Sequence, residues 1–333
     1  MGDSFKFFGR EFAEQLLATT SNPFVGLFIG ILATSLVQSS STTTSMTVAL
    51  VAAGGLEVSG AIPIVIGANI GTSVTNTLVS IVHISRPEEF RRAFSAATIH
   101  DFFNLIAVVI LFPVQLATNF LGRMASFLGT ELRDIGGLKL VNPIKLIVDP
   151  TADFITKLTG ESGTIMLAIS ILLLFLALRY IVINLKILVI GRVEAFFDVV
   201  IFKTALRALL FGVVLTIMVQ SSSITTSLAV PLAGAGILTL RQIFPMTLGA
   251  NVGTTITATL AALVTGELSA VTVAFAHVLF NLFGIAIIWP FRRIPLYMAT
   301  KMAELALLSK SFPLIYIGTV FFIVPLLLIY LIG

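Results

Sequence analysis

The sequence has no cysteine and very few charged residues. Asp, Glu, Lys and Arg make up only 11% of its 333 residues, whereas soluble domains carry about a quarter. With 57% hydrophobic residues, the chain cannot form an ordinary soluble surface, so we interpret it as a membrane protein. The absence of cysteine excludes disulfides and thiolate metal sites, and the three histidines show no metal-ligand spacing.

Positive charge is also scarce, and it is clustered beside apolar runs. The net charge of +4 comes from short groups such as Arg91-Arg92 and Arg292-Arg293. This placement indicates membrane topology and argues against nucleic-acid binding. Residues 83–93, 179–241 and 291–310 hold thirteen of the twenty Lys and Arg, so we expect these segments on the cytoplasmic side and both ends of the sequence outside.

Long uncharged runs fill most of the chain. About 20 apolar residues in a helix cross a hydrocarbon core of about 30 Å. We expect residues 1–21 to form an interfacial helix rather than a cleavable signal, because charged residues interrupt them. The predicted spans are residues 62–82, 94–118, 163–189, 244–264, 271–290 and 312–332.

An internal repeat organises the sequence. A shift of 182 positions aligns Gln38–Thr77 with Gln220–Thr259 without a gap, and 20 of the 40 positions are identical. Further along, His100 and Asn104 match His277 and Asn281 after a five-residue deletion, and Pro113 matches Pro290. Two long units of this kind are typical of secondary transporters.

Each repeat begins with a segment that is too long for one span. In residues 22–56, eight polar residues from Gln38 to Ser45 separate two short apolar runs, 23–37 and 46–56. This pattern predicts a re-entrant helical hairpin, repeated at 208–238. Three predicted spans separate the hairpins, so the second repeat should be inverted. The expected fold is an all-α polytopic membrane protein with repeat 1 at 1–118, a polar connection at 119–162, repeat 2 at 163–290, and a loop and final helix at 291–333.

The repeated Q-S-S-S motifs offer chemistry for an anion. A hydroxyl-rich turn between two half-helices supplies side-chain donors and unpaired backbone amides at a positive helix end. An isolated membrane hydroxyl more often bonds its own helix carbonyl, but dense hydroxyl clusters that occur twice favour a site. The predicted phosphate-binding residues are Ser39, Ser40, Ser41, Thr43, Ser221, Ser222, Ser223 and Thr225.

Neutral oxygen atoms near the same motifs suit sodium. The alternatives are helix packing for Gly67-x-x-x-Gly71 and its repeat, and helix capping for Asp101, whose repeat counterpart is Val278. We interpret His100 and His277 as polar residues in helix contacts, without a catalytic role. The predicted sodium-binding residues are Gln38, Gln220, Asn69, Asn251, Thr72, Thr254, Asp101 and Asn104, and sodium is the only metal expected.

These segments resemble the type II sodium-phosphate cotransporters and their bacterial relatives. The similarity lies in both Q-S-S-S motifs, in G-A-N-I-G-T-S-V-T-N-T from Gly67 and in F-R-R-A-F-S-A-A-T-I-H-D-F-F-N from Phe90. It implies sodium-coupled phosphate symport by alternating access, with no enzymatic activity and no cofactor beyond the coupling Na+. An aspartate at position 101 implies electrogenic transport.

The resemblance also carries expectations about the setting of the protein. It implies a multi-pass protein of the cell membrane that forms homodimers. The short polar connection favours a bacterial or archaeal source, because animal members have a long central loop. Relatives carry a hydrophobic segment before a Met-Gly-Asp like Met1-Gly2-Asp3.

Two other functions remain open from the residues alone. A passive anion channel shares polar residues at the membrane midplane but needs no coupled cation. An intramembrane serine hydrolase could use a Ser with His100 and Asp101. Duplication of the serines without the aspartate argues against the hydrolase.

Overall fold

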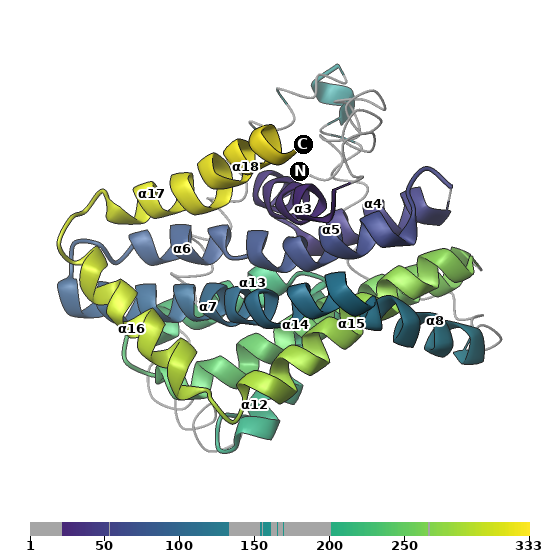
Figure 1. Cartoon of the computed structure of the whole chain (residues 1–333). Coiled ribbons are helices and arrows are strands. Elements are labelled where there is room, and N and C mark those ends of the chain that lie inside the picture. Colours follow the sequence, from purple (N-terminus) through teal and green to yellow (C-terminus); the bar gives the residue numbers. More distant parts are fainter. Residues whose placement is uncertain are drawn as a thin grey trace.

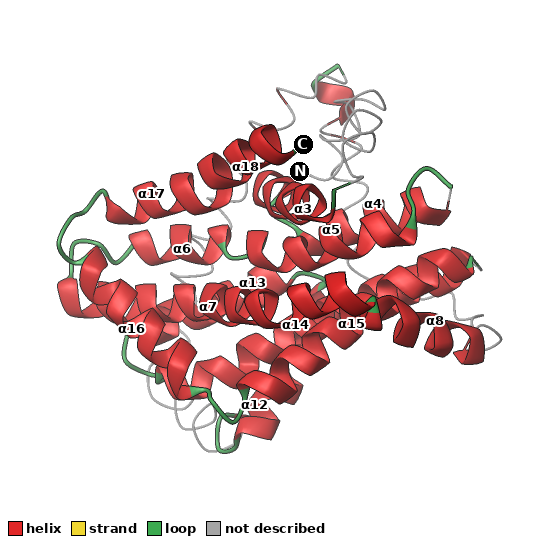
Figure 2. Cartoon of the chain, viewed as in Figure 1, coloured by secondary structure: helices red, strands yellow, loops and turns green. Residues whose placement is uncertain are grey.

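The described part of the chain is built from helices and has no strand. The computed structural model describes residues 22–52, 54–132, 154, 156–160, 165, 169, 201–265 and 267–333, and Figure 2 shows helices joined by short loops over these residues. The predicted interfacial helix at 1–21 and most of the span at 163–189 lie outside the described residues. The main helices of the first half are α3 (Pro23–Val37), α4 (Ser40–Ala52), α5 (Val58–Gly71), α6 (Val74–Ile81), α7 (Pro87–Thr118) and α8 (Phe120–Leu132).

The second half repeats the order of the first. Its helices are α12 (Ala205–Val219), α13 (Ser222–Gly234), α14 (Leu240–Thr265) and α15 (Leu268–Ile288), followed by α16 (Arg293–Ala306), α17 (Phe312–Ile317), the π-helix η4 (Gly318–Ile323) and α18 (Val324–Ile332). In Figure 1, α17 and α18 lie beside α6 and α3 of the first half. The final helices therefore pack on repeat 1.

Four helical segments within the described residues, two of them made of consecutive helices, are long and apolar enough to cross a membrane. They correspond to four of the predicted spans and are Val58–Ile81, Pro87–Thr118, Leu268–Ile288 and Phe312–Ile332. The predicted span 244–264 is helical and lies within α14. Helices α3 and α12 are apolar and have 15 residues each, which is shorter than the roughly 20 residues that a span needs.

One predicted boundary inside the first hairpin segment is wrong. The second helix begins at Ser40, whereas the sequence places it after the polar run, at Met46. The hydroxyl groups form hydrogen bonds with backbone groups at the start of this helix. Ser39 Oγ accepts from the backbone N–H of Thr42 at 3.2 Å, and Thr43 Oγ1 donates to the Ser39 carbonyl at 3.2 Å. Only Gln38 and Ser39 remain between the helices.

Glycines allow α3 to pack closely on α5, and α12 to pack closely on α14. A Cβ atom on Gly67 would collide with the carbonyl oxygen of Leu27, and one on Gly249 would collide with that of Leu209. These glycines are repeat equivalents, and they join α3 to α5 and α12 to α14 in the same way. The packing interpretation of the Gly-x-x-x-Gly motif is therefore confirmed for both repeats.

We expect Gly67→Ala and Gly249→Ala each to destabilise the protein. The clash is with backbone atoms, which cannot rotate away, so a cost of about 1–3 kcal/mol or more is expected. Thermal unfolding in detergent measures the loss. Gly318→Ala is the matched control, because a Cβ at Gly318 meets nothing within 4 Å. Equal unfolding temperatures for all three variants would contradict the close helix contact.

The two halves pack directly on each other. Helix α7 contacts α13, α14 and α15, and α4 contacts α14 and α15. At one edge of this interface, Arg92 donates through Nε and Nη2 to the carbonyl oxygen of Gly234 at 3.1 and 2.8 Å. Gly234 is the last residue of α13. Carbonyl groups at a helix C-terminus carry partial negative charge, so they attract the positive guanidinium of Arg92.

Candidate functional site

The Q-S-S-S motifs form two matching breaks between helices. Gln38 follows α3 with φ 57° and Gln220 follows α12 with φ 55°. This left-handed conformation is uncommon for residues other than glycine. In both breaks the backbone N–H of the glutamine donates to a carbonyl oxygen of the preceding helix. The acceptors are Thr34 for Gln38 and Thr216 for Gln220. The sequence repeat is therefore also a repeat of local backbone structure.

A serine caps the helix that follows each break. Ser39 Oγ accepts from the backbone N–H of Thr42 at 3.2 Å, and Ser221 Oγ accepts from that of Ile224 at 3.3 Å. Thr43 and Thr225 donate to the carbonyls of these capping serines at 3.2 and 3.1 Å. These four predicted phosphate-binding residues therefore stabilise the helix starts in this conformation.

The first residues of α4 and α13 meet across the two repeats. Ser40 Oγ lies 3.4 Å from Ser222 Oγ, and both side chains are buried. Each serine is the first residue of its helix, where backbone N–H groups lack partners within the helix and carry partial positive charge. The structure thus brings two helix N-termini and two hydroxyls to one buried place, which is chemistry suited to an anion.

The remaining predicted phosphate residues differ in their surroundings. Ser223 Oγ donates to the carbonyl oxygen of Thr72 at 3.3 Å, which joins α13 to the end of α5. Ser41 is half-buried. Thr225 also accepts from Thr216 Oγ1 at 2.9 Å, within its own repeat.

Polar residues in the first turn of α6 contact the first break and helix α13. Gln38 Oε1 accepts from Thr75 Oγ1 at 2.5 Å, and Asn76 Oδ1 accepts from Thr226 Oγ1 at 2.9 Å across the repeats. Helix α5 ends at Gly71 and α6 begins at Val74, whereas α14 runs unbroken through the equivalent positions. The sequence analysis did not single out Thr75, Asn76 or Thr226, although Thr226 lies in the repeated motif.

Four of the predicted sodium residues lie at the end of α5, inside α14 or in the breaks. Thr72 and Thr254 donate to carbonyls of their own helices, Ala68 and Ala250, at 3.0 and 3.2 Å. Gln38 contributes its Oε1 to Thr75, as described above, and donates through Nε2 to the Ser35 carbonyl. Gln220 occupies the equivalent break in repeat 2.

A symmetric network of His and Asn joins four helices in the core. His100 Nε2 lies 2.5 Å from Asn251 Oδ1, and the Asn251 amide donates to Asn104 Oδ1 at 2.8 Å. The repeat equivalent is complete: His277 Nε2 lies 2.8 Å from Asn69 Oδ1, and the Asn69 amide donates to Asn281 Oδ1 at 3.1 Å.

All six residues of this network are buried. Because each histidine faces an amide oxygen, its Nε2 acts as the donor. The expectation that the histidines make helix contacts is confirmed. The oxygens of Asn69, Asn251 and Asn104, which we predicted as sodium ligands, accept hydrogen bonds from protein groups in this conformation.

Asp101 stands outside this symmetry. It lies within α7, far from the ends at Pro87 and Thr118, and is buried with 4% exposure. The helix-cap interpretation of Asp101 is therefore wrong. Its Oδ2 accepts from the Tyr316 hydroxyl at 2.8 Å, whereas its Oδ1 is buried without a hydrogen-bond partner in the described structure. Tyr316 lies outside the repeats, so no repeat signal could have found it.

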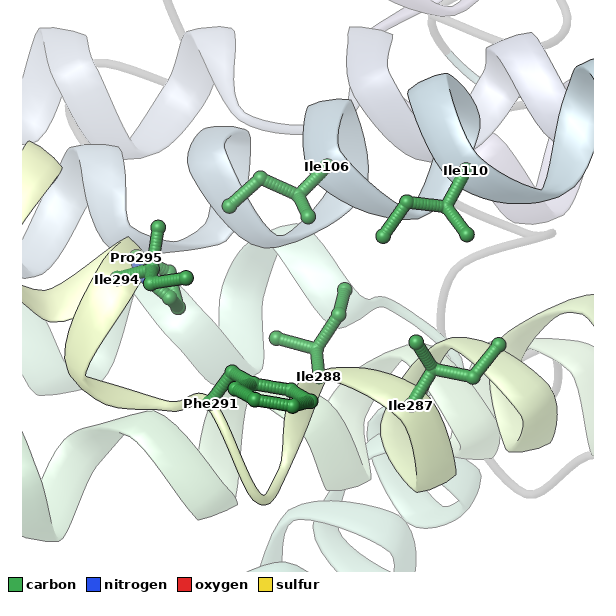
Figure 3. A pocket seen from close by; sticks show the side chains of 7 residues that line it. All are labelled: Ile106, Ile110, Ile287, Ile288, Phe291, Ile294 and Pro295. Atoms are coloured by element: carbon green, nitrogen blue, oxygen red, sulfur yellow. The ribbon is translucent and has the colours of Figure 1, made fainter.

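A surface groove between α7 and α15 can be excluded as an ion site. Its volume is about 140 Å³, and Figure 3 shows isoleucines of both helices lining it together with residues at the start of α16. Every lining side chain is apolar, so the groove offers no ligand to an ion. The lining residues are Ile106, Ile110, Ile287, Ile288, Phe291, Ile294 and Pro295.

Comparisons with known proteins point to one family. The sequence model described as "Na+/Pi-cotransporter" matches residues 1–135 and 173–296. Sodium-dependent phosphate transport protein 2B of Homo sapiens is 32% identical over 426 residues, which cover 98% of this chain and 62% of that protein. Protein 2A of Ovis aries is 32% identical over 408 residues, which cover 98% of this chain and 64% of that protein.

The chain thus spans about three fifths of the length of these relatives. No solved structure matches it. The relatives are transport proteins rather than enzymes. The family match covers well over half of the chain and includes both helix breaks. The chain belongs to the Na+/Pi-cotransporter family.

Proposed function

We propose that the protein is a sodium-coupled symporter of inorganic phosphate. The observation that carries this function is the meeting of Ser40 and Ser222, 3.4 Å apart at the first residues of two helices. A phosphate can accept hydrogen bonds from both hydroxyls and from the unpaired amides behind them. Ser39, Ser41, Ser221 and Ser223, with Thr43 and Thr225, complete the proposed phosphate set.

Sodium ions are proposed to bind through neutral oxygens and one carboxylate. The neutral ligands would come from the glutamines at the breaks and from Asn and Thr residues of α5, α7 and α14. Their present hydrogen bonds with each other mean that a bound ion would replace protein partners, which requires a change of conformation. The proposed set is Gln38, Gln220, Asn69, Asn251, Thr72, Thr254, Asn104 and Asp101.

The mechanism we propose is alternating access by two inverted repeats. The short apolar helices α3 and α12, each followed by a break, support the idea that α3–α4 and α12–α13 are re-entrant hairpins. We propose the domain limits 1–118 for repeat 1, 119–162 for the connection, 163–290 for repeat 2, and 291–333 for the loop and final helix. We further propose a homodimer in the plasma membrane of a bacterium or archaeon.

Uptake of radiolabelled phosphate into proteoliposomes tests the function. An inward sodium gradient should drive phosphate above its external concentration, and an equal potassium gradient should not. Liposomes without protein give the background. Sodium-independent equilibration of phosphate would instead identify a passive anion channel, and absence of phosphate movement under every gradient would contradict both functions.

A further inference from the structure

Tyr316 reaches the proposed sodium site from outside the repeats. Its hydroxyl donates to Asp101 Oδ2 at 2.8 Å, and Tyr316 and Asp101 are 9% and 4% exposed. The match to the family ends at residue 296, so Tyr316 lies beyond it. A separate segment of the chain therefore supplies a direct contact to the buried carboxylate that breaks the repeat symmetry.

The other oxygen of Asp101 remains open. Asp101 Oδ1 and Ser73 Oγ are both buried without a hydrogen-bond partner among the described residues. Ser73 lies beside this carboxylate, because it precedes α6, which packs against the helix α7 that carries Asp101. A buried carboxylate with one oxygen held and the other free is costly unless it is neutralised by a proton or a cation.

The Tyr316 ring is fixed by its neighbours. It packs edge-on against Phe321 with ring centroids 5.8 Å apart, and against Phe94 at 6.3 Å. Tyr316 lies in α17, and the residues that follow this helix, Gly318–Ile323, form the π-helix η4. Short π-helical segments often occur at functional sites. The two ring contacts and the neighbouring π-helix hold the Tyr316 hydroxyl in place beside Asp101.

We propose that Tyr316 is a positioning residue that holds Asp101 Oδ2 and so presents Oδ1, beside Ser73, to a coupling sodium ion. This inference rests on the proposed sodium-phosphate symport. A hydrogen bond from a hydroxyl to a carboxylate is stronger than one between neutral groups, and it keeps the carboxylate in one orientation before the cation arrives. The last membrane helix thereby becomes part of the sodium site instead of serving only as packing.

Replacing Tyr316 by Phe tests this role, because it removes the hydroxyl and keeps the ring. We expect the sodium concentration for half-maximal phosphate uptake to rise about tenfold, as expected for a lost hydrogen bond to a charged group. The phosphate concentration for half-maximal uptake, measured at saturating sodium, should stay unchanged. Tyr330→Phe is the matched control, because Tyr330 is 85% exposed. The sodium dependence of phosphate uptake should not change in this variant.

A packing role must be separated from a positioning role. Phe321→Leu weakens one of the two ring contacts of Tyr316 but keeps the hydroxyl and its contact with Phe94. It should therefore lower the unfolding temperature and shift the sodium dependence much less than Tyr316→Phe does. An equal sodium shift in Phe321→Leu would overturn the proposal. A parental sodium dependence in folded Tyr316→Phe would overturn it as well.

The Asp101→Gly background separates this inference from the proposed function. If Tyr316 acts through the carboxylate, Tyr316→Phe should cause no further sodium shift once Asp101 is replaced. The same shift in both backgrounds would refute positioning through Asp101. If Asp101→Gly itself leaves sodium dependence unchanged, the proposed sodium site fails. If Asp101→Gly changes it and Tyr316→Phe does not, only the role of Tyr316 fails.

Discussion

Replacing Ser40 or Ser222 by alanine is expected to abolish sodium-driven phosphate uptake at low phosphate concentrations. Each hydroxyl lies at the first residue of its helix, and the two oxygens are 3.4 Å apart, close enough to donate to one anion. A hydrogen bond to a charged group contributes about 1.5–3 kcal/mol. Each single substitution should therefore raise the half-saturating phosphate concentration by about tenfold to a hundredfold.

The control for this experiment is a buried serine that bonds only its own helix. Ser95 is 5% exposed and donates to the carbonyl of Arg91 at 2.8 Å, so Ser95→Ala should leave the phosphate dependence unchanged. All variants should show the parental unfolding temperature in detergent. Near-normal phosphate uptake in folded Ser40→Ala or Ser222→Ala would contradict a joint site at the two helix starts.

The sequence repeat predicted the breaks but not how they are built. The glutamines end α3 and α12 because the Q-S-S-S motifs follow apolar runs, and this position was readable from the sequence. The extent of the polar run was misleading, since hydroxyls can stabilise a helix by capping it or by bonding its own carbonyls. Six of the eight polar residues from Gln38 to Ser45 therefore lie inside α4.

Contacts between the repeats could not be predicted from spacing alone. The match of His100 with His277 and of Asn69 with Asn251 indicated equivalent positions. It did not reveal that each histidine contacts the asparagine of the other repeat. Such pairing depends on how α5, α7, α14 and α15 cross, and periodicity along one helix carries no information about crossing. Tyr316 lacked any signal, because it belongs to neither repeat.

Two buried polar residues of repeat 1 have apolar counterparts in repeat 2. Asp101 corresponds to Val278, and Asn76 corresponds to Ala258. Both polar residues lie in repeat 1, where α5 and α6 are separate helices, while α14 continues through the equivalent positions. The His–Asn network is symmetric, whereas Asp101 of α7 and Asn76 of α6 have no polar equivalent in repeat 2. This distribution fits one cation site that repeat 2 lacks.

Removing the Asp101 carboxylate is expected to make transport independent of membrane voltage. Phosphate is largely a divalent anion near neutral pH, so two sodium ions balance it and a third carries one net charge inward. Moving one charge through the membrane potential is worth about 2.3 kcal/mol per 100 mV. If the third sodium binds at Asp101, Asp101→Gly should leave slower phosphate uptake that no longer responds to an imposed potential.

Two further variants make this result specific to the buried carboxylate. Asp101→Asn removes the charge but keeps an oxygen that can accept from the Tyr316 hydroxyl, so it should lose the voltage response with less disturbance of packing. Glu88→Gln removes a carboxylate from an exposed ion pair with Arg91 and should retain the parental response. Uptake is measured in proteoliposomes with potassium and valinomycin setting the potential. If Asp101→Asn and Asp101→Gly respond to that potential as strongly as the parent, Asp101 binds no net transported charge, and its bond to Tyr316 serves only the packing of the last helix.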